Sequence, residues 1–455
     1  MPHDHDQDPD AGPAASTASP EGSAPAHRSL FVDLRPLRSS PAFARLWLGG
    51  AVSGIGGQMT IVAIGLQVYD LTGSTLAVSG VALFALAPMV FFGIYGGMLA
   101  DVVDRRVLAL AAGIAAWGST LCIALLAWFH VDNVWLLYLL ATLNSVAATV
   151  ISSTRMAIYP RILDRELLPA ASALGGISTG VMVTVGPALA GVLVATVGFG
   201  WTYSVDVVLF VFAFLGIVTL PSIVPEGEAS KPGWASIVEG LGFLRTAPNV
   251  RMSFIVDIIA MTFGQPRVIL PAAGALLLGG GPVTVGVLTA AFAVGALVSS
   301  VFSGPLGHVR LQGAAVGRAI VAYGGFILCL GIELVLLATG WFGTADAGHP
   351  NIPAIAIACL LFAGAGAADN VSAIFRQTIL QTATPDTMRG RIQGVFTVVV
   401  TGGPRLGDLY AGAAAALVAL WFPPVLGGLA IIGGVVLLMR LQPTFRRYDA
   451  MHPEP

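Results

Sequence analysis

Long apolar stretches, separated by short polar segments, make up the chain from about residue 40 onward. An α-helix rises about 1.5 Å per residue, so about 20 apolar residues are needed to cross the hydrocarbon core of a bilayer. Twelve stretches reach this length, namely residues 43–68, 75–99, 107–129, 134–156, 172–197, 201–220, 252–277, 283–304, 314–340, 353–376, 393–418 and 423–441. The pattern predicts an all-α membrane protein with twelve transmembrane helices, six on each side of a polar connector.

The positive charges fix the orientation that we expect for these helices. Lysines and arginines occur before the first stretch and after each even-numbered stretch, from the second to the twelfth. The loops that follow the odd-numbered stretches contain none. Cytoplasmic loops of membrane proteins carry an excess of Lys and Arg. We therefore predict a multi-pass protein with both termini in the cytoplasm.

The polar segments divide the chain into five parts. They are a disordered N-terminal tail at 1–40, a six-helix half at 41–220, a connector at 221–251, a second half at 252–441 and a C-terminal tail at 442–455. The first tail is rich in Pro, Ala, Ser, Asp and Gly and has no apolar periodicity, which is typical of disorder. Both tails are expected in the cytoplasm.

The connector contains one apolar helical face. Trp234, Ile237, Val238, Leu241 and Leu244 recur at helical spacing. Such a helix is expected to lie along the cytoplasmic membrane interface, and a docking site for a partner protein is the alternative interpretation.

Composition excludes several classes of function. Hydrophobic residues make up 56% of the 455 residues and charged residues 10%, and a water-soluble core cannot bury so much apolar surface. The sequence contains neither a phosphate-binding loop that ends in Gly-Lys-Ser/Thr nor a cluster with metal-ligand spacing. We therefore expect no enzyme, cofactor, metal site or nucleic-acid partner, and an ion gradient is the expected energy source.

The loop between the second and third stretches carries a distinctive set of residues. Gly97 allows close approach of a neighbouring helix, and Asp101 is placed to meet a helix N-terminus or an arginine. Arg105 and Arg106 hold the loop on the positive side of the membrane.

The fifth stretch contains a second cluster of helix-shaping residues. Gly186 and Gly191 allow close helix contact, and Pro187 frees a backbone carbonyl and permits a bend. Packing without further significance is the alternative to a functional role.

Ionisable residues within the predicted spans mark candidate functional positions. A charge near the bilayer centre costs about 2.5 kcal/mol or more, so such residues tend to be functional. Five in the second half are the candidates for function: Asp257, Arg267, Asp369, Arg405 and Asp408. The last two are three residues apart and share a helix face, where they are able to pair. Proton carrying or substrate contact is the favoured role for this set, and structural ion pairing is the alternative.

The first half and the ninth span hold fewer candidates. Gln58 and Asn144 are neutral, and we assign Asp206 and Glu333 to structural or interfacial roles.

The two halves look related to one another. Arg155 near Pro160 closes the fourth span much as Arg376 near Pro385 closes the tenth. Duplicated six-helix halves that rock about a central site are typical of alternating-access transporters.

The loop between the second and third stretches resembles the motif between helices 2 and 3 of the major facilitator superfamily. That motif is a glycine, three residues, Asp, Arg, two residues and a basic pair. Gly97, Asp101 and the pair Arg105–Arg106 match it, whereas Val102 and Asp104 depart from it. The resemblance implies the superfamily fold of two pseudo-symmetric six-helix halves, in which the loop serves the conformational cycle. The Gly-Pro cluster of the fifth stretch is similar to the helix 5 signature of the superfamily's antiporters.

Two longer stretches, 41–47 and 376–394, resemble the enterobactin-exporter branch of the superfamily, which includes macrolide-efflux relatives. This resemblance implies proton-coupled export of a siderophore across a bacterial inner membrane by a monomer in contact with lipid. Multidrug or macrolide efflux is the alternative, followed by a lipid-handling facilitator and a transporter-like sensor. The fourth span lacks the mid-membrane arginine of proton-coupled drug exporters and has Asn144 near that depth. Proton coupling is therefore expected to rest on the second half.

Overall fold

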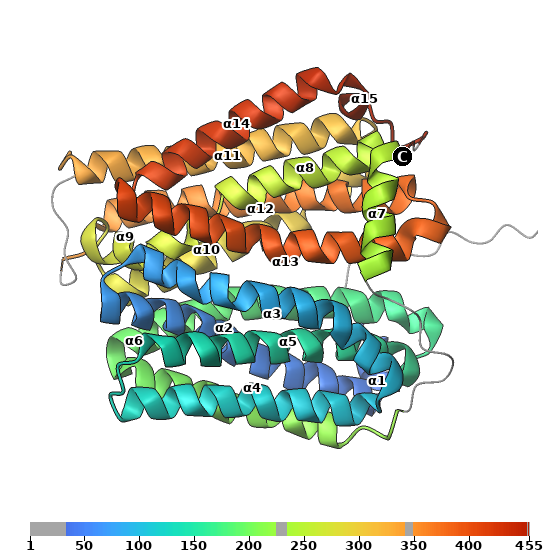
Figure 1. Ribbon diagram of the computed structural model, residues 1–455, viewed down its shortest axis with the longest axis horizontal. Helices are drawn as coiled ribbons and strands as arrows, with labels where there is room; N and C mark the ends of the chain where they lie inside the picture. The colour runs from blue at the N-terminus through green and yellow to red at the C-terminus, as the bar shows by residue number, and fades with distance from the viewer. Residues whose placement is uncertain (1–32, 224–233, 342–348, 453, 455) are drawn as a thin grey trace, which may run out of the picture.

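The computed structural model describes residues 33–223, 234–341, 349–452 and 454. Some helical residues, among them 93–102, are described by their backbone alone. The long helices run side by side along the longest axis of the molecule (Figure 1). They form two groups, one from each half of the chain.

The helices of the first group occupy the lower part of Figure 1. They are α1 (Arg35–Ser39), α2 (Pro41–Thr72), α3 (Thr75–Val102), α4 (Arg105–Trp128), α5 (Val134–Ile162), the short η1 (Arg165–Leu167) and α6 (Leu168–Val218). The second group consists of α8 (Pro248–Phe263), η2 (Arg267–Ile269), α9 (Leu270–Leu276), α10 (Gly281–Val301), η3 (Gly304–His308), α11 (Gln312–Ala338), α12 (Ile352–Ala383), α13 (Asp386–Leu417), α14 (Phe422–Leu441) and α15 (Pro443–Arg446), and α7 (Trp234–Thr246) precedes it.

The twelve predicted crossings are confirmed. Ten described segments are long and apolar enough to span a membrane. The longest, α6, has 51 residues, and it is interrupted at Gly198, whose φ of 82° is a conformation that glycine adopts readily. This break divides α6 into the fifth and sixth crossings. The 32-residue α13 is the remaining crossing, and its polar and charged residues explain why hydropathy alone misses it.

The seventh crossing differs from the continuous helix predicted for 252–277. It is divided into α8, η2 and α9, because Pro266 has no amide hydrogen to donate within a helix. The Tyr323 hydroxyl donates a hydrogen bond to the carbonyl oxygen of Gly264, a residue that caps the end of α8. The interruption places Arg267 in the short η2 turn.

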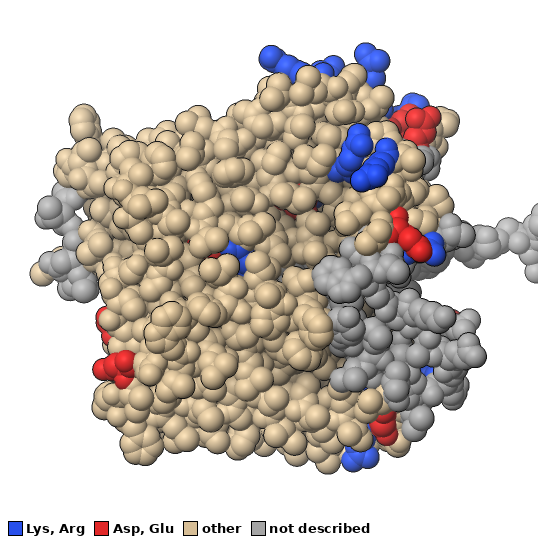
Figure 2. All heavy atoms as spheres, viewed as in Figure 1, with Lys and Arg blue, Asp and Glu red and all other residues tan. Residues whose placement is uncertain are grey.

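Charged side chains gather at the ends of the bundle. One end, which we call the arginine-rich end, carries Arg105, Arg161, Arg310, Arg391 and Arg440 at or near the ends of helices. Figure 2 shows a broad, mostly uncharged band between this end and the opposite one, with a few basic and acidic atoms near its middle and acidic side chains at the opposite end. Many large apolar side chains are exposed between the ends, as expected of a lipid-facing surface.

The two halves contact each other at the end opposite to the arginine-rich end. The Thr75 hydroxyl, at the start of α3, donates to the carbonyl oxygen of Gly412 near the end of α13 (3.0 Å). Gly191 of α6 and Gly286 of α10 face each other, and a Cβ on either would lie 3.1 Å from the other's Cα. The described contacts therefore close this end of the molecule.

Helix α7 crosses the bundle at the arginine-rich end (Figure 1). Glu239 pairs with Arg391 of α13 at 2.5 Å, and Leu244 is buried. Val238 and Leu241 are 63% and 50% exposed, which suits the interfacial position predicted for them. The side chains of Trp234 and Ile237 lie outside the described residues, as do 1–32 of the predicted tail.

Candidate functional site

The loop motif after α3 is described in part. Gly97 and Asp101 are described by their backbone alone, so their contacts lie outside the described structure. Arg105 donates to the Ala157 carbonyl of α5 (2.9 Å), and Arg106 donates to the Val218 carbonyl of α6 (2.8 Å). Both arginines thus tie the start of α4 to the ends of neighbouring helices.

Asp104, which departs from the superfamily motif, is the N-cap of α4. Its side chain accepts from the Arg106 amide (2.8 Å), the Ser222 hydroxyl (2.5 Å) and the Ile223 amide (3.2 Å). These hydrogen bonds lower the pKa of the Asp104 carboxyl, and the one from Ser222 has the largest effect. The residue fastens the end of the sixth crossing to the third, a role that sequence reasoning missed.

The glycines of the fifth crossing lie at two different helix contacts. A Cβ on Gly186 would lie 2.5 Å from the Gln58 Cβ of α2, within the first half. A Cβ on Gly191 would lie 2.5 Å from the Pro282 carbonyl oxygen of α10, in the second half. Pro187 is inside α6, and its carbonyl oxygen lies beside Gly286. The cluster thus shapes contacts both within and between the halves.

Two candidates of the second half, Asp257 and Asp369, meet at one arginine. Asp257 of α8 pairs with Arg376 of α12, and the two side chains are 4% and 7% exposed. Arg376 also lies 4.0 Å from Asp369, one-third of whose side chain is exposed. Arg376 therefore holds two carboxylates of different accessibility.

The other candidates of the second half lie around this cluster. The charge of Arg267 acts on both Asp369 and Asp408, and the guanidinium lies 5.6 Å from the centre of the Phe292 ring. Arg405 donates to the Met89 sulfur of α3 (3.0 Å).

The predicted pairing of Arg405 with Asp408 is wrong as a direct contact. Within the described part of the chain, these two side chains form no ion pair. Arg405 points instead to the neighbouring helix of the other half.

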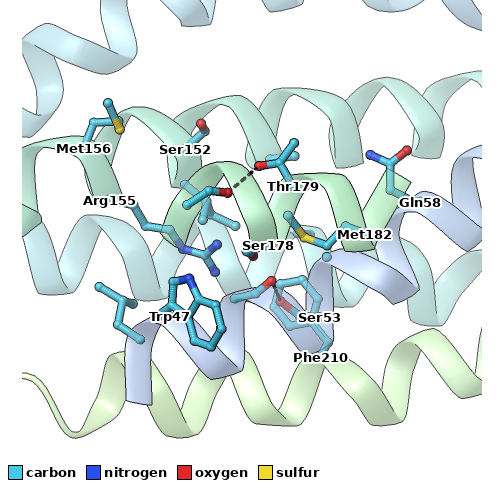
Figure 3. Close-up of a pocket in the computed structure, with 18 of the residues that line it drawn as sticks. Trp47, Ser53, Gln58, Ser152, Arg155, Met156, Ser178, Thr179, Met182 and Phe210 are labelled. Carbon is cyan, nitrogen blue, oxygen red and sulfur yellow. Dashed lines mark hydrogen bonds between the residues drawn. The ribbon is translucent and has the colours of Figure 1, made fainter. Parts of the chain in front are cut away.

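The first half contains a partly open cavity of about 470 Å³ between α2, α4, α5 and α6. Such a volume lies in the range of small-molecule sites. Polar side chains line it, among them Gln58, Thr120, Asn144, Arg155 and Asp206. Figure 3 shows the Arg155 guanidinium directed into this cavity, on the side of Trp47 and Ser178.

Two of the polar groups in the cavity are held by hydrogen bonds. The Asn144 amide donates to the Thr120 hydroxyl (2.9 Å), and the Thr60 hydroxyl donates to Asp206 Oδ2 (2.5 Å). The other oxygen of Asp206 and the Nε of Arg155 have no hydrogen-bond partner.

Sequence reasoning missed Arg155 and Arg376, which it placed at the cytoplasmic ends of the fourth and tenth spans. Both helices continue past these arginines, α5 to Ile162 and α12 to Ala383. Each arginine is thus about two turns inside its helix, about 10 Å from the helix end. Their similar positions in the two halves were the available signal.

Solved structures confirm the fold. The nucleoside transporter NupG is 14% identical, with a TM-score of 0.63 over 90% of this chain and 99% of that protein. A POT family transporter, solved with a thioalcohol-conjugated peptide, is 12% identical, with a TM-score of 0.63 over the same shares of both chains. These proteins are transporters, and at such identities they establish the architecture only.

Sequence comparison gives more similar relatives. The enterobactin exporter EntS of Citrobacter koseri is 28% identical over 432 residues, which is 94% of this chain and 98% of the exporter. EntS of Shigella boydii is 27% identical over 435 residues with the same coverage. The sequence model of the transmembrane secretion effector family, MFS_3, matches residues 32–454. The chain therefore belongs to this family of major facilitator transporters and is not an enzyme.

Proposed function

We propose that this protein is a proton-coupled exporter of a siderophore of the enterobactin type. The observation that carries the proposal is the similarity to EntS, because it extends over nearly the whole of both chains. Multidrug or macrolide efflux is the alternative outcome of the test below.

In this proposal the arginine-rich end faces the cytoplasm, together with both termini and the connector helix α7. The halves touch at the opposite end, through Thr75–Gly412 and Gly191–Gly286. The described state is thus suited to receiving cargo from the cytoplasm. Rocking of the halves exposes the cargo on the other side.

Asp369 is our choice for the proton carrier. It is one-third exposed and lies 4.0 Å from Arg376, so water reaches it while a cation stays near. Asp257 is 4% exposed and already paired with the same arginine. A proton on Asp369 removes one of the two negative charges that compete for Arg376. Arg376 then pairs with Asp257 alone, so protonation is linked to the contact between α8 and α12.

The test is uptake into inverted inner-membrane vesicles under an imposed pH gradient. Iron-free enterobactin and erythromycin are compared as substrates. Enterobactin uptake that a protonophore abolishes supports the proposal, whereas uptake of erythromycin alone makes this a drug-efflux protein.

The variant Asp369→Asn tests the proton carrier in the same vesicles. We expect gradient-driven uptake to be lost while substrate binding is retained. Asp132→Asn is the control, because Asp132 is exposed between α4 and α5. Normal pumping by Asp369→Asn would remove this residue from the mechanism.

A further inference from the structure

In each half, an arginine packs against the first long helix of that half, but the helix residue that it meets differs. Both α2 and α8 begin with a proline, Pro41 and Pro248. Nine residues further on, α8 has Asp257 and α2 has Gly50. Asp257 pairs with Arg376 of α12. Gly50 lies directly against Arg155 of α5, because a Cβ on it would be 2.6 Å from Arg155 Nη1.

Arg155 therefore corresponds to Arg376 in position, but it lacks the carboxylate that Asp257 gives to Arg376. Within the described residues, no Asp or Glu forms an ion pair with it, and its Nε has no hydrogen-bond partner. Asp206, the one carboxylate among the described cavity-lining residues, is bound to Thr60. Thr60 is ten residues from Gly50, about 15 Å along α2.

A cation directed into a low-dielectric cavity is costly unless an anion compensates it. No described carboxylate provides that compensation, whereas an anionic molecule that enters the cavity can. The Trp47 ring and the hydroxyls of Ser152 and Ser178 line the same cavity (Figure 3). These groups can pack against a flat ring and donate hydrogen bonds to oxygen.

We propose that Arg155 is the anion-binding subsite of the transport cavity and binds paired oxygens of the cargo, a carboxylate or an ionised catechol. A guanidinium binds such oxygen pairs through two parallel hydrogen bonds. Because Gly50 has no carboxylate, unlike Asp257 in the second half, the Arg155 guanidinium stays available to bind cargo. This inference rests on the proposed function, because it concerns the cargo of the same transporter.

The structure itself suggests the decisive variant. Gly50→Asp copies into the first half the carboxylate that neutralises Arg376 in the second. Gly50→Asn has nearly the same size and no charge, so it is the matched control. In both variants the new Cβ displaces only the mobile end of the Arg155 side chain.

Binding to the purified full-length protein is measured by isothermal titration. The probes are iron-free enterobactin, 2,3-dihydroxybenzoate and its uncharged amide, 2,3-dihydroxybenzamide. We expect Gly50→Asp to weaken binding of enterobactin and the benzoate about tenfold or more relative to Gly50→Asn. An equal effect on the amide assigns the contact to the catechol oxygens, and an effect on the benzoate alone assigns it to the carboxylate.

The thermal stability of the same two variants gives a readout that needs no ligand. Gly50→Asp should melt at a higher temperature than Gly50→Asn, because it forms the pair seen in the second half. If neither Gly50 variant folds, Arg155→Lys and Arg155→Gln replace them. The lysine variant should then retain more binding than the glutamine variant.

The outcomes separate this inference from the proposed function. Equal affinities of Gly50→Asp and Gly50→Asn for every probe overturn the inference, even where enterobactin is transported. Charge-dependent binding of the benzoate without binding of enterobactin supports the inference and overturns the siderophore proposal. Failure of all three probes to bind the unaltered protein overturns both.

Discussion

The buried ion pair of the second half gives the sharpest stability prediction. Asp257 and Arg376 are 4% and 7% exposed, so each depends on the other for charge compensation. Removing one partner of a buried pair typically costs about 3–5 kcal/mol, because the other charge is left without compensation. The two single variants should nevertheless differ.

Asp257→Asn leaves Arg376 with Asp369 at 4.0 Å, so its cost should fall near the lower end of that range. Arg376→Gln leaves both carboxylates without their cation, so its cost should reach the upper end. At about 2 °C per kcal/mol, the two variants should melt roughly 6 and 10 °C below the unaltered protein. The double variant Asp257→Asn/Arg376→Gln removes both charges and should recover part of the loss.

The assay is thermal unfolding in detergent at a fixed heating rate, followed by intrinsic fluorescence. Arg310→Gln is the control, since the Arg310–Asp449 pair is at the surface and Arg310 is 66% exposed. Its melting temperature should be unchanged. Additive losses in the double variant would show that the pair contributes no coupling, and equal losses in the two single variants would remove Asp369 from the cluster.

Two further predictions concern the helix contacts. Gly191→Val should push α6 away from the Pro282 carbonyl and open the end opposite to the arginine-rich end, whereas Gly175→Val, with no atom within 4 Å of its Cβ position, should not. Spin labels at Thr72 and Leu417 measure this as a longer distance, and an unchanged distance contradicts it. Asp104→Ala removes the N-cap of α4 and should cost about 1 kcal/mol. Since the folded pKa of Asp104 is lowered, this difference in unfolding free energy should be complete above about pH 4 and shrink as the pH falls further. A difference that grows toward acid would refute it.

The sequence was sufficient for the architecture because membrane topology depends on local patterns. Apolar length indicated most of the crossings, and several arginines lie at one end of the bundle, although Arg155 and Arg376 lie inside their helices. The break in the seventh crossing was readable in principle from Pro266, but the long apolar stretch around it outweighed one proline.

The candidate site was less predictable because it depends on contacts between helices distant in the chain. Asp257 and Arg376 are 119 residues apart, and nothing local indicates that α8 and α12 bring them together. Sequence spacing suggested a pair between Arg405 and Asp408 on one helix, whereas Arg405 reaches Met89 in the other half. Helix periodicity indicates which residues share a face, but the partner of that face comes from tertiary packing.

The proposals for the two halves depend on one difference in charge. In the second half Asp257 compensates Arg376, and the partly exposed Asp369 is left to exchange a proton with water. In the first half Gly50 takes the place of that carboxylate, and Arg155 is left to meet an anion in the cavity. One duplicated arginine can thus serve proton handling in one half and cargo binding in the other. Gly50→Asp abolishes only the second task under this scheme, so it should weaken cargo binding while Asp369 still exchanges its proton.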